Sequence, residues 1–409
     1  MVFELRPYQH LISLALIASF FLFNFIDRNI SDLILVIIFL FSISLALYNF
    51  NTDYLNTDKS EYLFLRSFFL FFLIILFYYF YHGSDIDNLD NYSRFLLMIP
   101  IYYYFRKVSL NYKFIYYVVV LCAFISFIHG LHDVYSHGYY RATAASNLSI
   151  TYGNLNITLF VILCVLYNYR KAYSLNQYII ITGLVFSLIA WYLSLTRGSI
   201  IGLLFCFLYF AYLYRSNLSL SKILLILLIP LTILVLPNND RIKILANDIN
   251  IILNSPSQSQ MLTKSSQERI FYYSTSIKII SSYPFDGIGL NKNKFKEYLD
   301  LENKKNKSKI KISSHSHNDF LSLGVKVGVL GIFALIYFYY SCILFFRKNY
   351  GLSSITNMYS DLGVVVCLSQ LGFMMTQTQL HHHQATIFFL FFIILISSQL
   401  SYLRRDNLE

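Results

Sequence analysis

The chain has 409 residues, of which 56% are hydrophobic, 18% are aromatic and 13% are charged. Its mean hydropathy of +0.54 excludes a soluble globular domain and a disordered chain, because neither accommodates so many apolar side chains. A net charge of +11 suggests nucleic acid as a partner only in a soluble protein. We therefore predict an all-α polytopic membrane protein that binds membrane lipid and no nucleic acid.

Apolar runs long enough to cross a hydrocarbon core of roughly 30 Å predict about twelve transmembrane helices. The runs occupy residues 10–26, 31–50, 61–81, 92–105, 113–130, 147–167, 177–195, 198–214, 221–237, 319–346, 355–377 and 384–402. The first has no small-residue cleavage site after it, so we interpret it as a span rather than a removed signal. The fourth is short and contains Pro100, but without it most basic pairs of the later short loops would lie on the wrong side of the membrane.

This topology places both termini in the cytoplasm and divides the chain into three regions. Residues 1–237 contain helices one to nine, and residues 319–409 contain helices ten to twelve and a cytoplasmic tail. Residues 238–318 form the one long polar connection, a predicted periplasmic loop domain with 13 Lys and Arg against 7 Asp and Glu. Polar loops of this length usually carry a function.

Within the loop domain, the sequence predicts an amphipathic helix over residues 266–282. Ser265-Ser-Gln-Glu268 matches a capping box, and apolar residues follow at the spacing of one helical face, at Ile270, Tyr273, Ile277 and Ile280. Farther on, lysines alternate with polar residues between positions 304 and 311. We interpret that stretch as a solvated loop or strand.

The pattern Ser314-His315-Ser316-His317-Asn318-Asp319 stands where the loop domain re-enters the membrane. An imidazole with a reference pKa of roughly 6.5 is mostly neutral at neutral pH and accepts protons. His317 is therefore a candidate general base. The alternative interpretation is a loop histidine that only makes a hydrogen bond at a helix start.

Three arginines on the same predicted side of the membrane are candidate ligands for an anion. Arg197 lies between two spans with almost no loop, where a charge is costly and usually functional, although it can also snorkel toward headgroups. Arg269 lies at the start of the amphipathic helix, where the helix dipole opposes a cation, so it either faces an anion or is a surface charge. Arg141 is an extra phosphate or sugar contact or an interfacial charge. If the anion is a diphosphate, guanidinium groups bind its oxygens in bidentate fashion, so no metal ion is needed to neutralise its charge.

Other patterns carry less weight. We interpret Asp85-Ile86-Asp87 as an acidic solvated loop. Asp90 and Arg94, which follow closely in the sequence, are weaker candidates for lining a cavity at this place. His381-His382-His383 has no carboxylate or cysteine beside it, which is weak evidence for a metal. The five cysteines fall within apolar runs and are interpreted as small hydrophobic residues. We therefore predict no metal and no cofactor.

Three ordered motifs make the sequence similar to the bacterial O-antigen ligase family. They are Leu195-Thr196-Arg197-Gly198; Glu268-Arg269-Ile270 followed by Pro284-Phe-Asp-Gly287-Ile-Gly289; and His315-Ser-His317-Asn318-Asp-Phe-Leu321 followed by Gly328-Val-Leu-Gly331. The resemblance implies a GT-C-like fold with one large periplasmic loop before the tenth span. It also implies inverting, metal-independent transfer of a glycan from undecaprenyl diphosphate to a hydroxyl of lipid A–core oligosaccharide, at the periplasmic face of the inner membrane.

The resemblance also implies roles for individual residues. His317 would activate the acceptor hydroxyl, with His315 as the alternative or second base. Arg197 and Arg269 would hold the diphosphate, and Arg141 would be an additional contact. We expect replacement of His317 by alanine nearly to abolish transfer.

Two other functions remain open. An O-antigen polymerase would use the same donor with a second lipid-linked glycan as acceptor, but the related polymerases carry an arginine followed eleven positions later by a glycine. Here the residue at that offset is Tyr152 after Arg141 and Ile280 after Arg269, which favours the ligase. A transporter of lipid-linked glycans would show repeated halves and polar residues at mid-membrane, and the sequence shows no clear repeat.

Overall fold

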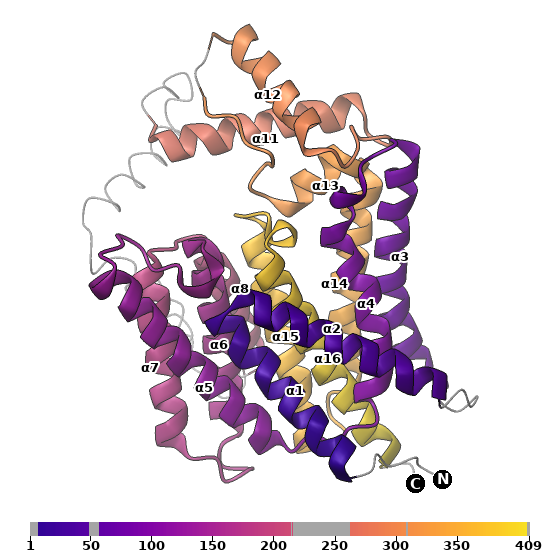
Figure 1. The fold of residues 1–409 in the computed structure, drawn as a ribbon, viewed down its shortest axis with the longest axis vertical. Coiled ribbons are helices and arrows are strands. Elements are labelled where there is room, and N and C mark those ends of the chain that lie inside the picture. Colours follow the sequence, from indigo (N-terminus) through magenta and orange to yellow (C-terminus); the bar gives the residue numbers. More distant parts are fainter. Residues whose placement is uncertain (1–6, 49–56, 214, 216–261, 308–309, 407–409) are drawn as a thin grey trace.

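A computed structural model describes residues 7–48, 57–213, 215, 262–307 and 310–406, and all of its regular structure in these ranges is helical. Figure 1 shows a bundle of long helices with a smaller helical group at one end. The bundle contains α1 (Pro7–Ile26), α2 (Arg28–Tyr48), α3 (Lys59–Tyr81), α4 (Asp90–Phe105), α5 (Tyr112–Leu131), α6 (Ser149–Tyr169), α7 (Gln177–Ser194), α8 (Ser199–Leu213), α14 (Val329–Lys348), α15 (Ser354–Met374) and α16 (His383–Asp406). The group at the end contains α11 (Lys264–Ser282), α12 (Lys292–Lys305) and α13 (Asp319–Val327).

Seven of the described helices are long and apolar enough to cross a membrane: α1, α3, α5, α6, α7, α14 and α16. The chain is therefore an all-α polytopic membrane protein. The predicted fourth span is a continuous helix despite its internal Pro100, but α4 has only 16 residues. The predicted ninth span, residues 221–237, lies outside the described residues. The number twelve therefore stays a prediction.

The centre of the bundle is formed by α6, α15 and α16. The most apolar window of α16 is 89% buried and that of α6 is 78% buried, against 33% for α1 and α7. The helix α15 carries buried polar residues such as Asp361 and Gln370. Because its neighbours shield it, α15 tolerates a polar content that a lipid-exposed helix does not.

The predicted tenth span, residues 319–346, is not one helix, and this prediction was wrong. It is divided at Gly328, which has φ +71°, into the short helix α13 and the span α14. A Cβ on Gly328 would lie 2.4 Å from the carbonyl oxygen of Pro284. The break is therefore imposed by a chain segment more than forty residues away, which the apolar pattern does not reveal.

The segment that causes this break is the turn at residues 284–289. Its backbone is tied to the α13–α14 junction, because Val329 N donates to Pro284 O at 2.7 Å and Ile288 N donates to Val325 O at 2.8 Å. Figure 1 shows α11 and α13 close together, and the two helices are in contact. The Pro284–Gly289 and Gly328–Gly331 motifs, noted separately in the sequence, are thus parts of one junction.

The helix predicted over residues 266–282 is confirmed as α11, but the capping box was wrong. The helix begins at Lys264 with Thr263 as N-cap, and no side chain caps it. Its start is held by Gln267 Nε2, which donates to Leu262 O at 2.8 Å. The capping-box pattern is two residues too late, since the third helical position of this helix is residue 266 and not Glu268.

The lysine-rich stretch differs from the prediction as well, since Lys304 and Lys305 form the last turn of α12 instead of a loop. The buried Phe295 and Leu299 give α12 an apolar face. They join a small hydrophobic cluster with residues of α11, α13 and the connections around them: Phe271, Tyr272, Ile279, Ile288 and Val325. This cluster stabilises the helices that carry part of the candidate site.

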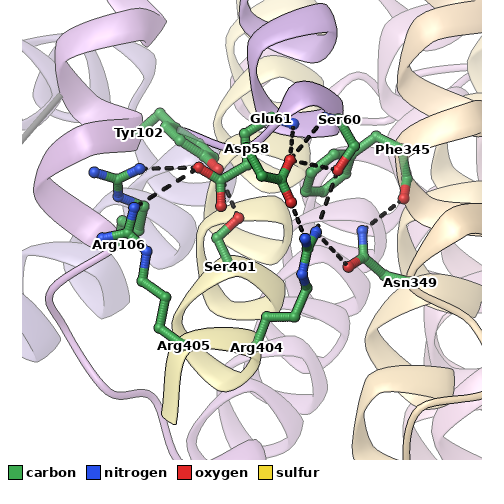
Figure 2. Close-up of polar contacts among 10 residues, drawn as sticks. All are labelled: Asp58, Ser60, Glu61, Tyr102, Arg106, Phe345, Asn349, Ser401, Arg404 and Arg405. Atoms are coloured by element: carbon green, nitrogen blue, oxygen red, sulfur yellow. Dashed lines mark hydrogen bonds and ion pairs between the residues drawn. The ribbon is translucent and has the colours of Figure 1, made fainter. Parts of the chain in front are cut away.

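The opposite end of the bundle is held by an ion-pair network (Figure 2). Arg106 Nη1 lies 2.9 Å from Glu61 Oε2, and both side chains are almost completely buried. Arg404, in the last turn of α16, pairs with the carboxylate of Asp58 and donates to Ser60 Oγ. The network connects the start of α3 to the ends of α4 and α16. Arg404 lies after the predicted last span, residues 384–402, in the tail that is predicted to be cytoplasmic.

Candidate functional site

Three segments singled out from the sequence meet at the connection between α15 and α16, residues 375–382. The 315–319 segment reaches it through Asn318, whose Nδ2 donates to Met375 O at 3.0 Å. The α7–α8 connection reaches it at Gly198, whose carbonyl oxygen accepts from Thr376 Oγ1 at 3.3 Å. The connection that carries Arg197 and the histidine segment therefore both contact the 375–382 connection.

Helix α11 completes this convergence. The hydroxyl of Tyr273 lies 3.4 Å from His317 O and 3.5 Å from Met375 O. The ring of Tyr272 stacks on the imidazole of His317 at 5.7 Å between centroids. Arg269 precedes Tyr273 by one helical turn and is half-buried.

Gln377 determines which ring nitrogen of His317 carries the proton. His317 Nδ1 lies 2.8 Å from Gln377 Oε1, and Gln377 Nε2 lies 2.7 Å from His382 Nε2. An amide oxygen only accepts hydrogen bonds, so His317 Nδ1 carries the proton and donates it to Gln377. The lone pair of His317 is therefore on Nε2, where a neutral imidazole accepts a proton.

The backbone of His317 adopts an uncommon conformation, with φ +55°. The left-handed region is costly for a residue with a Cβ and persists when surrounding contacts impose it. The next residue, Asn318, provides such a contact, since its side chain caps α13 by accepting from Leu321 N at 3.0 Å. Backbone strain of this kind is concentrated at functional sites.

The electrostatic environment keeps His317 neutral. Burial lowers its pKa, the hydrogen bond to Gln377 opposes this effect, and the positive charge of Arg269 lowers the pKa further. The neutral form therefore dominates at physiological pH and is available to accept a proton.

His315 lies beside His317, with 4.5 Å between ring centroids, but in a different environment. Burial, together with the neighbouring His317 and His382, lowers its pKa to about 3. Its Nδ1 lies 3.1 Å from Ser314 Oγ, and among the described residues its buried Nε2 has no hydrogen-bond partner. A group with so low a pKa is a weaker base than His317.

Behind the two histidines lies a buried polar group that the sequence analysis did not assign. Lys326 Nζ is 2.7 Å from His381 Nε2 and 3.3 Å from the hydroxyl of Tyr92. Asp319 Oδ2 accepts from Leu380 N at 3.2 Å. Burial raises the pKa of Asp319 and lowers that of Lys326, while their mutual attraction opposes both shifts. These contacts hold α13 against the 375–382 connection.

The arginines predicted to bind diphosphate take different positions. Arg197 is exposed in the α7–α8 connection. Arg141 lies on the same connection: its Nε donates to Ser194 O at 2.8 Å and its Nη2 to Thr196 Oγ1 at 3.3 Å. Arg141 therefore braces the segment that carries Arg197. No contact in the described residues tests whether any of the three binds a diphosphate, and these roles stay predictions.

The comparison with known families adds a decisive observation. Residues 182–336 match the family described as O-Antigen ligase. This part of the chain is therefore similar to the O-antigen ligase family. The matched region includes Arg197, Arg269, His315 and His317, and it ends before Gln377. No curated protein matches the chain.

The side chains of the three adjacent histidines diverge toward different partners. His381 meets Lys326, His382 meets Gln377, and His383 Nε2 lies 2.6 Å from Asp32 Oδ1. The five cysteines are free thiols in the structure.

One group in the described part of the chain has ligand atoms close enough for a metal: His132, Asp133 and His137, within 4.8 Å of one another. The carboxylate of Asp133 already accepts from Thr143 N at 2.7 Å and Ala144 N at 2.6 Å. The carboxylate thus orders the loop that leads to and from Arg141.

Gln377, Thr376 and Lys326 are site residues that sequence reasoning missed. One signal was present for Lys326, because a lysine within an apolar run is usually functional. Gln377 belongs to no recognised pattern, and only the folded chain brings it to His317.

Proposed function

We propose that this protein is an O-antigen ligase: an inverting glycosyltransferase that moves a glycan from undecaprenyl diphosphate to a hydroxyl of lipid A–core oligosaccharide. The proposal includes the periplasmic face of the inner membrane as the site of reaction, without a metal or other cofactor. Its main support is the bond between His317 Nδ1 and Gln377 Oε1, which leaves Nε2 of a neutral imidazole to act as the base.

The proposed chemical step is a single displacement. The acceptor hydroxyl oxygen forms a bond to the anomeric carbon while the bond from that carbon to the phosphate oxygen breaks. The hydroxyl proton moves to His317 Nε2, and undecaprenyl diphosphate leaves with the bonding electrons. Attack opposite to the leaving group inverts the configuration. Gln377 Oε1 stabilises the imidazolium that forms, because it accepts from Nδ1 throughout the step.

Arg197 and Arg269 are the proposed diphosphate ligands. Both lie on segments that meet the 375–382 connection, Arg197 beside Gly198 and Arg269 one turn from Tyr273. Two guanidinium groups would stabilise the charge that develops on the leaving diphosphate. Arg141, which contacts the α7–α8 connection, is proposed as the additional contact.

The proposed orientation follows from the distribution of basic residues. The end of the bundle opposite α11–α13 gathers Arg106, Arg404 and Arg405 (Figure 2). Lys and Arg near span ends favour the cytoplasmic side. The α11–α13 group and the histidines would then face the periplasm.

The test is transfer by the purified full-length protein with a lipid-linked glycan donor and lipid A–core acceptor. His317→Ala should lower the rate about 10²- to 10⁴-fold, which is the usual contribution of a general base. His10→Ala, near Ser109 at the other end of the bundle, is the matched control and should retain the rate. A His317→Ala protein that transfers at the normal rate would remove this assignment.

The O-antigen family match does not separate a ligase from a polymerase, so a second experiment does. A deletion strain that loses all polymer on its lipopolysaccharide core supports the ligase. Retention of one repeat unit supports the polymerase. Movement of the lipid-linked donor across the membrane without bond formation would instead support a transporter.

A further inference from the structure

A small pocket that is partly open to solvent adjoins His315. The start of α12, the helix α13 and the segment before it form its wall. Its polar lining residues include Asn291, Lys292, Ser314, His315, Ser322 and Lys326. None of these residues takes part directly in the proposed reaction. His315 is connected to it because its ring lies against that of His317.

The pocket has a positive electrostatic character that is separate from that of the arginines. Lys326 and Lys292 are the cations that act on His315, whereas Arg269 and Lys311 act on His317. The two histidines therefore stand between two cationic groups. One of them is the proposed place of the donor diphosphate. In the other, Asp319 attracts Lys326, and the proposed reaction assigns no anion to Lys292.

His315 also presents a polar atom that lacks a partner. Its buried Nε2 has none among the described residues, and leaving a buried polar atom unpaired is unfavourable. The hydroxyl of Ser314, 3.1 Å from Nδ1, can donate to that nitrogen, which leaves the ring proton on Nε2. An N–H donor next to two ammonium groups matches an oxygen-rich anion.

We propose that this pocket binds a phosphate or carboxylate group carried by the acceptor saccharide, on a sugar neighbouring the one whose hydroxyl His317 deprotonates. The inference rests on the proposed function and adds the chemical class of the acceptor. It also assigns Lys292 a role in acceptor specificity. Because the His315 and His317 rings are in contact, an anion at the lysines would place the rest of the saccharide at the base.

The first test measures transfer by the full-length protein while acceptor or donor concentration is varied. Lys292→Ala should raise the KM for lipid A–core about 10-fold, the effect of losing one charge-assisted hydrogen bond, and leave the KM for the donor unchanged. Lys292→Arg should restore the acceptor KM. Lys296→Ala, on the same helix and outside the pocket, is the control. An unchanged acceptor KM in Lys292→Ala, or a raised donor KM, would overturn the proposal.

A second test does not depend on transfer, so it separates this proposal from the proposed function. Glucose 6-phosphate, glucuronate and glucose are titrated into the protein by calorimetry without donor. Binding of the two charged sugars only, with loss in Lys292→Ala, supports the pocket whether or not transfer occurs. Equal binding of all three sugars overturns it. Displacement of glucose 6-phosphate by phosphatidylglycerol, with no change in acceptor KM on mutation, assigns the pocket to a lipid headgroup and also overturns it.

Discussion

His317 Nδ1 lies 2.8 Å from Gln377 Oε1, so a side chain between α15 and α16 determines which nitrogen of the proposed base is protonated. The same amide reaches His382 through its Nε2. A histidine can present either nitrogen, and the partner of one nitrogen decides the role of the other.

Gln377→Glu should change the pH dependence of transfer. A carboxylate at this position keeps the Nδ1 hydrogen bond and adds a negative charge, which raises the pKa of His317 by about 1 unit or more. Because only neutral His317 accepts a proton, the acidic limb of the kcat/KM profile should move to higher pH. Gln9→Glu, at the other end of the bundle, should leave the profile in place. An unmoved acidic limb in Gln377→Glu would show that Gln377 has only a structural role.

Arg269→Gln should move the acidic limb in the same direction for a different reason. Burial is the main cause of the low pKa of His317, and Arg269 lowers it further. Without that charge the pKa rises, so activity is lost at a higher pH as the solution is acidified. Arg269→Lys retains the charge and should retain the profile. The profile measured at saturating donor separates this effect from weaker diphosphate binding.

Arg141→Ala should weaken donor binding through the α7–α8 connection. The change removes the bonds to Ser194 O and Thr196 Oγ1, and we expect the donor KM to rise about 10-fold, as for loss of a hydrogen bond to a charged group. Arg170→Ala, which removes an arginine stacked on Tyr167, is the control. A donor KM equal to that of the unmodified protein would exclude a bracing role for Arg141.

Gly328→Ala should destabilise the α13–α14 junction. The positive φ alone costs about 1–3 kcal/mol for a residue with a Cβ, and the added atom would also meet Pro284 O. Gly351 has φ +95° and open space around its Cβ position, so Gly351→Ala measures the conformational cost alone. Thermal unfolding in detergent should show a larger loss for Gly328→Ala. Equal losses of thermal stability would mean that the 284–289 turn moves aside for the added methyl group without lowering the stability further.

Periodicity and charge identified most of the bundle, because a span must be apolar along its whole length whatever its neighbours are. The starts and ends of α3, α5 and α7 follow their apolar runs closely. The break at Gly328 escaped this reasoning, since the turn that causes it is distant in sequence. The candidate site divides in the same way. Motifs indicated His317 and Arg197, whereas Gln377 is recognisable only by its contact with His317.

The ion pair and hydrogen bond that join Arg404 to the start of α3 have a consequence for biosynthesis. They join α16 to a helix that is synthesised 344 residues earlier, with Arg404 Nη1 donating to Ser60 Oγ. The histidine partner Gln377 and its neighbour His382 enter the nascent chain just before that helix. A polypeptide released before residue 375 would therefore carry the imidazole of His317 without the Gln377 side chain that orients it, and the proposed base would lack its hydrogen-bond partner.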